Sequence, residues 1–425
     1  MTINTIKQFR TFSSFKSRNY RLYFTGQSVS LIGTWMQKTA VSWVIYTLTH
    51  STFMLGVTLF ASLFPSFLLS LIGGVVSDRY NRYRVLLITQ VASLIQALLL
   101  AILILLKHYA VWEILSLSVV LGIINAFDVP ARQSLVYEMV DDKKDLPNAL
   151  ALNSSMVNLS RIIGPAIAGI VLEGIGDGAC FLLNALSFVA VLASLLMMRL
   201  PRYVKKIHKK NVFGELKEGF AYLKRSPSIA FVIFMLALVS LLVLPYNTLI
   251  PYFARDVFKG TARTFGVIDS FIGLGAFSGA IFLASQKSGA NLKKILCINT
   301  LVFGAGLVLF SHEHIYALAL FFVTVAGFGM MSQVTITNTI IQTTVAPAMR
   351  GRVISLYAMA FFGMQPLGGI IVGAVSKWIG AADTLTAQGV AALFLGFLHW
   401  RYLRKENLKK GHDIVLKEEH GLQAV

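Results

Sequence analysis

Residues 53–106 read FMLGVTLFASLFPSFLLSLIGGVV, then SDRYNRYR, then VLLITQVASLIQALLLAILILL, which are two apolar runs around a short basic segment. Each run is longer than the about 18 uncharged residues that mark a candidate membrane span. Such a span is helical, because a helix satisfies its own backbone hydrogen bonds in lipid. Neither run shows the polar–apolar alternation of a membrane β-strand. The stretch therefore predicts two membrane helices joined by a basic turn.

The same pattern covers the whole chain of 425 residues. Of these, 56% are hydrophobic and only 13% are charged, whereas a soluble domain carries about 25% charged residues. We expect an all-α membrane protein with twelve transmembrane helices, arranged as two pseudo-symmetric six-helix bundles. The expected spans are 20–48, 53–77, 85–106, 112–138, 148–172, 178–198, 229–250, 264–286, 295–311, 314–345, 352–376 and 381–400.

One polar stretch divides these spans into two groups of six. We expect an N-terminal bundle over 1–198, a cytoplasmic basic linker over 199–228, a C-terminal bundle over 229–400 and a cytoplasmic basic tail over 401–425. The linker also carries apolar residues at helical spacing, which favours an amphipathic helix lying on the inner leaflet. The alternative is a plain connector. The apolar residues are Val212, Phe213, Leu216, Phe220 and Leu223.

The formal net charge of +19 is explained by where the charges lie. Most of the 38 Lys and Arg residues fall in segments that are cytoplasmic if both termini are inside. This asymmetry is the positive-inside rule, and it predicts two cytoplasmic termini and some affinity for anionic lipid. We therefore expect a lipid bilayer and no nucleic acid as partner. The outer loops hold only Lys107, Arg255, Lys259, Arg263 and Lys377.

Helix-breaking residues recur at matching positions of the two halves. GPAIAG carries Gly164, Pro165 and Gly169, and GMQPLGG carries Pro366, about 200 residues later. Such matching breaks indicate the substrate region of a transporter. We expect these four residues to act as hinges; the alternative is a kink that only improves packing.

Several motifs resemble the major facilitator superfamily. GGVVSDRYNRYR at 73–84 is similar to its signature Gly-x-x-x-Asp-Arg-x-Gly-Arg-x-Arg, with asparagine at position 81 where the family has glycine. Asparagine tolerates a left-handed backbone, so we expect the turn to survive. GPAIAG resembles the Gly-Pro-x-x-Gly-Gly motif of the proton-driven antiporters. NAFDVPARQSLVYEMV, LPNALALNS and RGRVISLYAMAFFGMQPLGG look like the branch of enterobactin exporters and macrolide-efflux-like proteins.

The resemblance implies a multi-pass secondary transporter of the bacterial cytoplasmic (inner) membrane. It also implies that the loop after the second span latches the two halves on the inner side when the outer side is open. We expect Asp78 to contact Arg352, or the helix end beside it, where the dipole favours a carboxylate. The alternative is ordinary positive-inside charge. The expected cytoplasmic gate consists of Gly74, Asp78, Arg79, Arg82 and Arg352.

Charged residues also lie deep inside the spans. Asp128 and Arg161 are both about 15–20 Å from the inner helix ends, so we expect them to pair. With Arg132 and Lys38 the first half holds three cations against one carboxylate, which favours an anionic or strongly polar substrate. The alternative is a structural brace, with Lys38 extending outward. The expected substrate and proton cavity consists of Lys38, Asp128, Arg132, Arg161, Gln37, Asn158 and Gln365.

Proton coupling needs a group that titrates inside the membrane. Asp128 is the first candidate and Asp269 the second. A close arginine would lower the proton affinity of Asp128, which is an argument against it.

These features favour proton-driven export (antiport) of a small amphipathic or anionic molecule, siderophore-like or drug, by alternating access. The alternatives are import of a small solute, or a receptor or scaffold with the same fold. A primary pump is not expected, because the chain has no phosphate-loop motif, and an enzyme is not expected, because it has no Ser/His/Asp, HExxH or CxxC pattern. We expect no cofactor and no metal, and Cys180 and Cys297 as small apolar residues. The expected partners are the small molecule, protons and the bilayer, and the expected state is a monomer.

Overall fold

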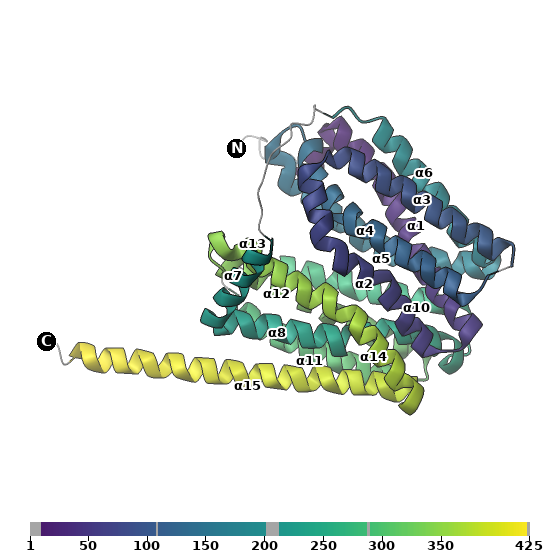
Figure 1. Ribbon diagram of the computed structural model, residues 1–425. Coiled ribbons are helices and arrows are strands. Elements are labelled where there is room, and N and C mark those ends of the chain that lie inside the picture. Colours follow the sequence, from purple (N-terminus) through teal and green to yellow (C-terminus); the bar gives the residue numbers. More distant parts are fainter. Residues whose placement is uncertain (1–9, 108, 201–211, 287–289, 423–425) are drawn as a thin grey trace, which may run out of the picture. The chain divides into compact units, whose positions relative to one another are not determined.

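The computed structural model describes residues 10–107, 109–200, 212–286 and 290–422 (Figure 1). Within those ranges every regular element is a helix. In this described part of the chain, eleven helical stretches are long and apolar enough to cross a membrane. The first expected span is not among them, although it forms a helix of 32 residues, because it carries polar residues such as Gln27, Gln37 and Lys38. The all-helical membrane fold predicted from the sequence is confirmed.

The first packing unit comprises residues 1–212 together with 247–273. In it, α1 packs against α5 and α6, α3 packs against α4 and α6, and α2 packs against α4 (Figure 1). A 3-10 turn precedes α1 at Arg10–Lys16, and a second at Lys143–Asp145 precedes α5. The helices are α1 (Arg18–Thr49), α2 (Thr52–Arg79), α3 (Arg82–Leu105), α4 (Val111–Met139), α5 (Leu146–Gly174) and α6 (Asp177–Leu196).

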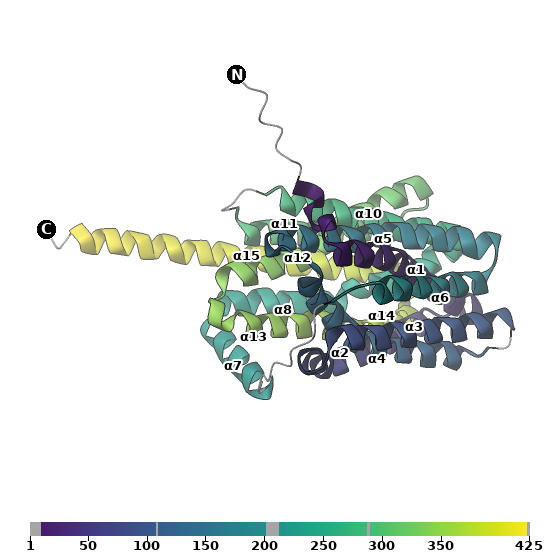
Figure 2. The same cartoon turned by 90° about the horizontal axis from the view of Figure 1, so that it is seen from above.

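The second packing unit comprises residues 213–246 and 274–425. In it, α11 packs against α12 and α15, and α14 packs against α8. The last helix continues as one element well past residue 400, where the expected span ended (Figures 1 and 2). The helices are α7 (Val212–Arg225), α8 (Pro227–Leu242), α11 (Leu292–Ser311), α12 (Tyr316–Thr344), α13 (Pro347–Ala358), α14 (Met364–Ile379) and α15 (Ala381–Leu422).

The seventh expected span is broken into short pieces. After α8 the chain forms a 3-10 segment (Leu244–Leu249), α9 (Ile250–Tyr252) and a π-helical turn (Phe253–Val257) before α10 (Ala262–Ala284). Pro245 and Pro251 interrupt the α-helical hydrogen bonds here, because proline has no backbone N–H. Residues 247–273 pack with the first unit. A segment from the second half of the sequence thus completes the first unit.

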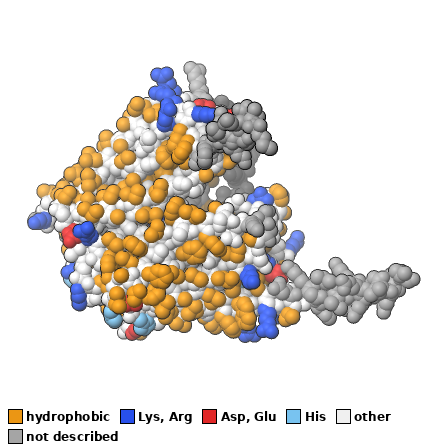
Figure 3. Space-filling view, turned by 180° about the vertical axis from the view of Figure 1, so that it is seen from behind, with side chains coloured by type: hydrophobic (Ala, Val, Ile, Leu, Met, Phe, Trp, Pro, Cys, Tyr) orange, Lys and Arg blue, Asp and Glu red, His pale blue; other side chains and the backbone are white. Residues whose placement is uncertain are grey.

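Apolar side chains also cover the outside of the molecule. Figure 3 shows hydrophobic side chains over most of the displayed face and charged side chains mainly near its margins. Large exposed examples come from many helices, including Ile88, Trp112, Ile170, Leu186 and Phe394. Exposed apolar area on this scale is expected where the solvent is lipid.

Candidate functional site

Asp128 lies on α4 and is 5% exposed. Its Oδ1 accepts hydrogen bonds from Thr89 Oγ1 at 3.0 Å and Gln90 Nε2 at 2.8 Å, both on α3. Its Oδ2 lies 3.2 Å from Arg132 Nε, although that N–H is not aimed well enough for a hydrogen bond. Arg132 also interacts electrostatically with the Tyr23 hydroxyl on α1. The buried carboxylate therefore has one cation and two neutral donors.

The cation beside Asp128 differs from the expected one. The sequence predicted Arg161, whereas the structure pairs Asp128 with Arg132, one helical turn further along α4. Residues four apart lie on the same face of a helix, so this pair forms without any help from tertiary packing. Arg161 belongs to α5, which packs chiefly on α1. Its side chain accordingly meets residues of α1.

A second set of charged side chains lies near the indole of Trp35 on α1. Lys38 Nζ lies 4.8 Å and Arg161 Cζ 5.6 Å from the ring centroid, within the range of cation–π attraction. Asp269, on α10, accepts a hydrogen bond from Thr39 Oγ1 at 3.0 Å and interacts electrostatically with both Lys38 and Arg161. We call these five residues the Trp35 cluster.

The Trp35 cluster is open to solvent on the side of Lys38. Lys38 is exposed, whereas its neighbours Gln37 and Thr39 are each 2% exposed. Lys38 therefore lies on the accessible face of α1, more than ten residues from either end of this 32-residue helix. Two cations, one carboxylate and one large aromatic surface can together hold an anion attached to an apolar or aromatic body.

One face of α1 continues from this cluster toward the C-terminal end of the helix. Thr39, Trp43 and Tyr46 are spaced by four and three residues, so they share that face. The Trp43 ring stacks on Phe265 with centroids 6.0 Å apart, and the Tyr46 hydroxyl donates to the carboxylate of Asp256. Together with the Thr39–Asp269 bond, these contacts join α1 to residues 256–269.

Helix α5 meets the same segment through small residues. Ser270 Oγ donates to the Ile162 carbonyl at 2.8 Å. A Cβ added to Gly266 would lie 2.3 Å from the Pro165 carbonyl oxygen, and one added to Gly169 would lie 2.9 Å from the Arg263 Cα. The backbones touch because no side chain separates them. We call the contacts of α1 and α5 with residues 256–273 the outer seam.

The GPAIAG motif thus lies between α1 and α10. Gly164 faces α1, where an added Cβ would be 2.5 Å from the Trp35 Cβ, and Gly169 faces α10. Pro165 leaves the Arg161 carbonyl without its helical N–H donor. An added Cβ at Gly273 would lie 2.9 Å from that carbonyl oxygen, so α10 covers it closely.

Pro366 differs from Pro165 in its surroundings. A π-helical turn (Met359–Gly363) precedes it and separates α13 from α14, whereas α5 runs through Pro165 without a break. The missing N–H of proline accounts for the irregular turn before it. A Cβ at Gly368 would lie 2.0 Å from the Leu241 carbonyl oxygen, so this break also lies beside a tight helix contact. The hinge roles remain predictions.

The amide side chains predicted to line the cavity are placed differently from one another. Gln37 is 2% exposed; its Nε2 donates to Gln96 at 3.1 Å, and its Oε1 accepts from Asn184 at 2.7 Å. We interpret it as part of a closed network among α1, α3 and α6. Asn158 is half-buried and donates to the Ser154 carbonyl of its own helix at 2.9 Å, and Gln365 is half-buried in the second unit.

The basic turn after α2 is held by Arg82. Its guanidinium lies 2.9 Å from Glu138 and 3.9 Å from Asp78, and its Nε donates to the Ser77 carbonyl. Asn81 does not have the left-handed backbone that we expected, because its φ is −64°. Its side chain instead accepts hydrogen bonds from the backbone N–H groups of residues 83 and 84 and caps α3. Gly74 is half-buried and Arg79 is exposed.

Arg352 has a partner within the second unit. It forms an ion pair of 2.9 Å with Glu218 on α7. At the same contact, a Cβ added to Gly219 would lie 3.3 Å from the Arg352 carbonyl oxygen. The helix predicted in the linker therefore exists over Val212–Arg225 and docks on α13. The Asp78–Arg352 latch remains a prediction.

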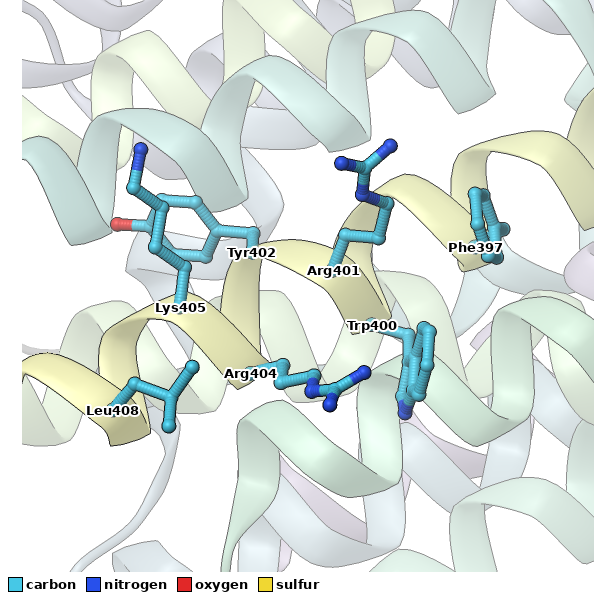
Figure 4. Close-up of a pocket in the computed structure, with 7 residues that line it drawn as sticks. All are labelled: Phe397, Trp400, Arg401, Tyr402, Arg404, Lys405 and Leu408. Carbon is cyan, nitrogen blue, oxygen red and sulfur yellow. The ribbon is translucent and has the colours of Figure 1, made fainter.

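A surface hollow on α15 is a different kind of site. Figure 4 shows that its aromatic and basic side chains all come from this one helix. Arg404 lies over the Trp400 ring at 5.8 Å. Aromatic and basic residues at the end of a span are typical of anchoring at the membrane interface. The residues are Phe397, Trp400, Arg401, Tyr402, Arg404, Lys405 and Leu408.

Known proteins match this chain over almost its full length. A family model described as transmembrane secretion effector matches residues 9–415. The staphyloferrin A transporter of Staphylococcus aureus is 26% identical and aligns over 92% of this chain and 97% of its own length. The enterobactin exporter of Shigella flexneri is 25% identical over 89% of this chain and 90% of its own length.

The fold also matches solved transporters. A POT-family transporter in complex with 5-aminolevulinic acid aligns with a TM-score of 0.74 at 14% identity, over 92% of this chain and 96% of that one. Identity this low carries the fold alone. These findings confirm the resemblance drawn from the motifs.

Proposed function

This chain belongs to the transmembrane secretion effector family of the major facilitator superfamily, and we propose that it exports a small amphipathic or anionic molecule, driven by the proton gradient. It is a multi-pass membrane protein and a secondary transporter rather than an enzyme. The further proposal is that the cargo leaves the cytoplasm, that both termini are cytoplasmic and that the protein works as a monomer.

The Trp35 cluster is the observation that supports the cargo class. Lys38 and Arg161 provide two positive charges, and Trp35 provides a flat apolar surface beside both. An intramembrane charge normally faces a cavity or the bundle interior and marks a substrate path. A siderophore-like compound or a drug that joins an anionic group to an aromatic or apolar body would use both features. The names of the two curated relatives are consistent with cargo of this kind.

Asp128 is the residue that we propose for proton coupling. It faces one cation, Arg132, and it also interacts with the Tyr23 hydroxyl. A proton on the carboxylate would remove the charge that neutralises Arg132 and leave the guanidinium with Tyr23. Such an exchange of partners would change the contacts among α1, α3 and α4, which is the kind of differential interaction that a coupling step needs.

The test is accumulation of a panel of siderophores and drugs in inverted vesicles, with and without an imposed pH gradient. We expect gradient-dependent accumulation by the wild type, loss in Asp128→Asn, and retention in Glu173→Gln. Glu173 is a matched control because it is an exposed carboxylate at the end of α5. Equal accumulation with and without the imposed pH gradient would exclude proton coupling. Absence of accumulation for every compound would overturn the export proposal.

A further inference from the structure

Asp269 is an acidic neighbour of both cations in the Trp35 cluster. Its carboxylate interacts electrostatically with Lys38 and Arg161 and accepts the hydrogen bond from Thr39. Lys38 and Arg161 both lie against the Trp35 ring, so their positive charges repel each other unless a carboxylate lies beside them. In the protein without cargo, the Asp269 carboxylate therefore neutralises the two cations, as an anionic cargo would when it is bound.

We propose that Asp269 is an internal substitute for the cargo, and that the carboxylate of an aromatic or amphipathic cargo replaces it at Lys38 and Arg161. This inference rests on the proposed function for the identity of the transported class. It assigns to Asp269 a specificity role: the site accepts a carboxylate because it already holds one. Trp35, beside both cations, would stack on the body of the cargo.

The replacement would also act on the outer seam. Asp269 is one of three residues of the second half that bond or stack on the single face of α1 formed by Thr39, Trp43 and Tyr46. A cargo that displaces its carboxylate removes the charge interactions and the Thr39 hydrogen bond from one end of the seam. Binding then favours conformations in which the seam is open, because a ligand shifts an equilibrium by its differential affinity. The empty protein closes the seam again with its own carboxylate.

This role of Asp269 differs from proton antiport in whether cargo and proton strengthen or weaken each other's binding. Cargo and Asp269 compete for the same cations, so a proton on Asp269 strengthens cargo binding. By linkage, cargo then strengthens proton binding equally, and the two would travel in the same direction. In antiport, cargo and proton must weaken each other's binding, so the antiported proton has to bind a carboxylate other than Asp269. This agrees with the proposal that Asp128 couples transport to protons. The charged groups facing Asp269 are Lys38 and Arg161.

Equilibrium binding of fluorescein to the purified full-length protein tests the inference. Fluorescein carries an aromatic carboxylate, and its methyl ester is the same dye without that carboxylate but with the ionisable xanthene hydroxyl. We expect Asp269→Asn to bind fluorescein at least about tenfold more tightly than the wild type, with a smaller gain for the ester. Lys38→Met should bind fluorescein more weakly than the wild type.

Two further variants keep the result interpretable. Asp269→Glu retains the charge and should return fluorescein affinity toward the wild-type value. Glu173→Gln removes an exposed carboxylate elsewhere and should leave it unchanged. Equal or weaker fluorescein binding by a folded Asp269→Asn, an equal gain for the ester, or no binding by any variant would each overturn the inference. Because binding requires no transport, failure of this test is distinct from failure of the vesicle assay.

Discussion

Replacing Gly266 by alanine tests the contact between α5 and α10. The new Cβ would lie 2.3 Å from the Pro165 carbonyl oxygen and 3.0 Å from both the Cα and the nitrogen of Gly169. Carbon and a carbonyl oxygen come into close contact at about 3.3 Å, so the two backbones have to separate by about 1 Å. The clash is with backbone on a helix, which cannot swing away as a flexible side chain can.

The size of the effect follows from this overlap. An extra methyl group in a tightly packed contact costs about 1–3 kcal/mol. The penalty applies only to conformations in which the seam is closed. Alanine also favours a helix over glycine by about 1 kcal/mol, but this gain acts in both conformations and cancels. We therefore expect the equilibrium to shift about 5- to 150-fold toward an open seam.

A cysteine in the seam reports the shift. Ala262 is 4% exposed and lies where Gly169 meets α10, so Ala262→Cys should react slowly with a membrane-impermeant thiol reagent added outside. Cys180 and Cys297 are buried, which keeps the background low. With Gly266→Ala added, the labelling rate should rise at least about fivefold. Gly174→Ala is the control, because no described atom outside its own helical turn lies within 4 Å of the added Cβ. Equal labelling of the two variants would refute the reasoning.

Two other predictions concern the turn between α2 and α3. Asp78→Asn should reduce vesicle transport while membrane insertion stays normal, because we expect the carboxylate to latch the two halves on the inner side; wild-type transport by a normally inserted variant would contradict the latch. Asn81→Ala should destabilise the protein by about 1 kcal/mol and Asn81→Gly by only a few tenths, because Asn81 caps α3. Thermal unfolding in detergent measures the stability of the two Asn81 variants, and an unchanged stability of Asn81→Ala would show that the cap bonds contribute little.

Helix positions could be predicted from the sequence because they depend on local composition. The apolar runs fix where helices begin and end to within a few residues, as α2 and α3 illustrate. The seventh span was harder, because Pro245 and Pro251 lie in a run that is apolar enough to look continuous. Composition shows that a segment is apolar, but a proline within it interrupts the continuous hydrogen bonds of an α-helix.

The site could be predicted only in part, because its pairings depend on which helices touch. Lys38, Arg161 and Asp128 were found as charges deep in apolar runs. Their depth did not reveal that α5 packs on α1, and so it suggested the wrong cation for Asp128. Asp269 was ranked second as a proton carrier because it lies toward one end of its span. Its contact with Thr39 is made across 230 residues of sequence, and no local pattern predicts it.

Asn81 shows a third kind of difference. The family signature has glycine at this position, which suggested a backbone conformation that favours glycine. The structure shows an extended residue whose side chain caps a helix. Glycine and asparagine are both good N-caps, so the exchange is explained by capping rather than by a left-handed turn.

The packing of residues 247–273 with the first unit has a consequence for biosynthesis. A ribosome delivers α1 to α6 to the membrane before it has made the residues that cover them. Until residue 273 has been synthesised, Thr39 cannot bond to Asp269 and Tyr46 cannot bond to Asp256. The glycine face of α5 also has no contact with α10 until then. These contacts of the first bundle therefore form only after residues 256–273 have been made. Early and late steps of insertion are thereby linked through the same surface that we propose opens during transport.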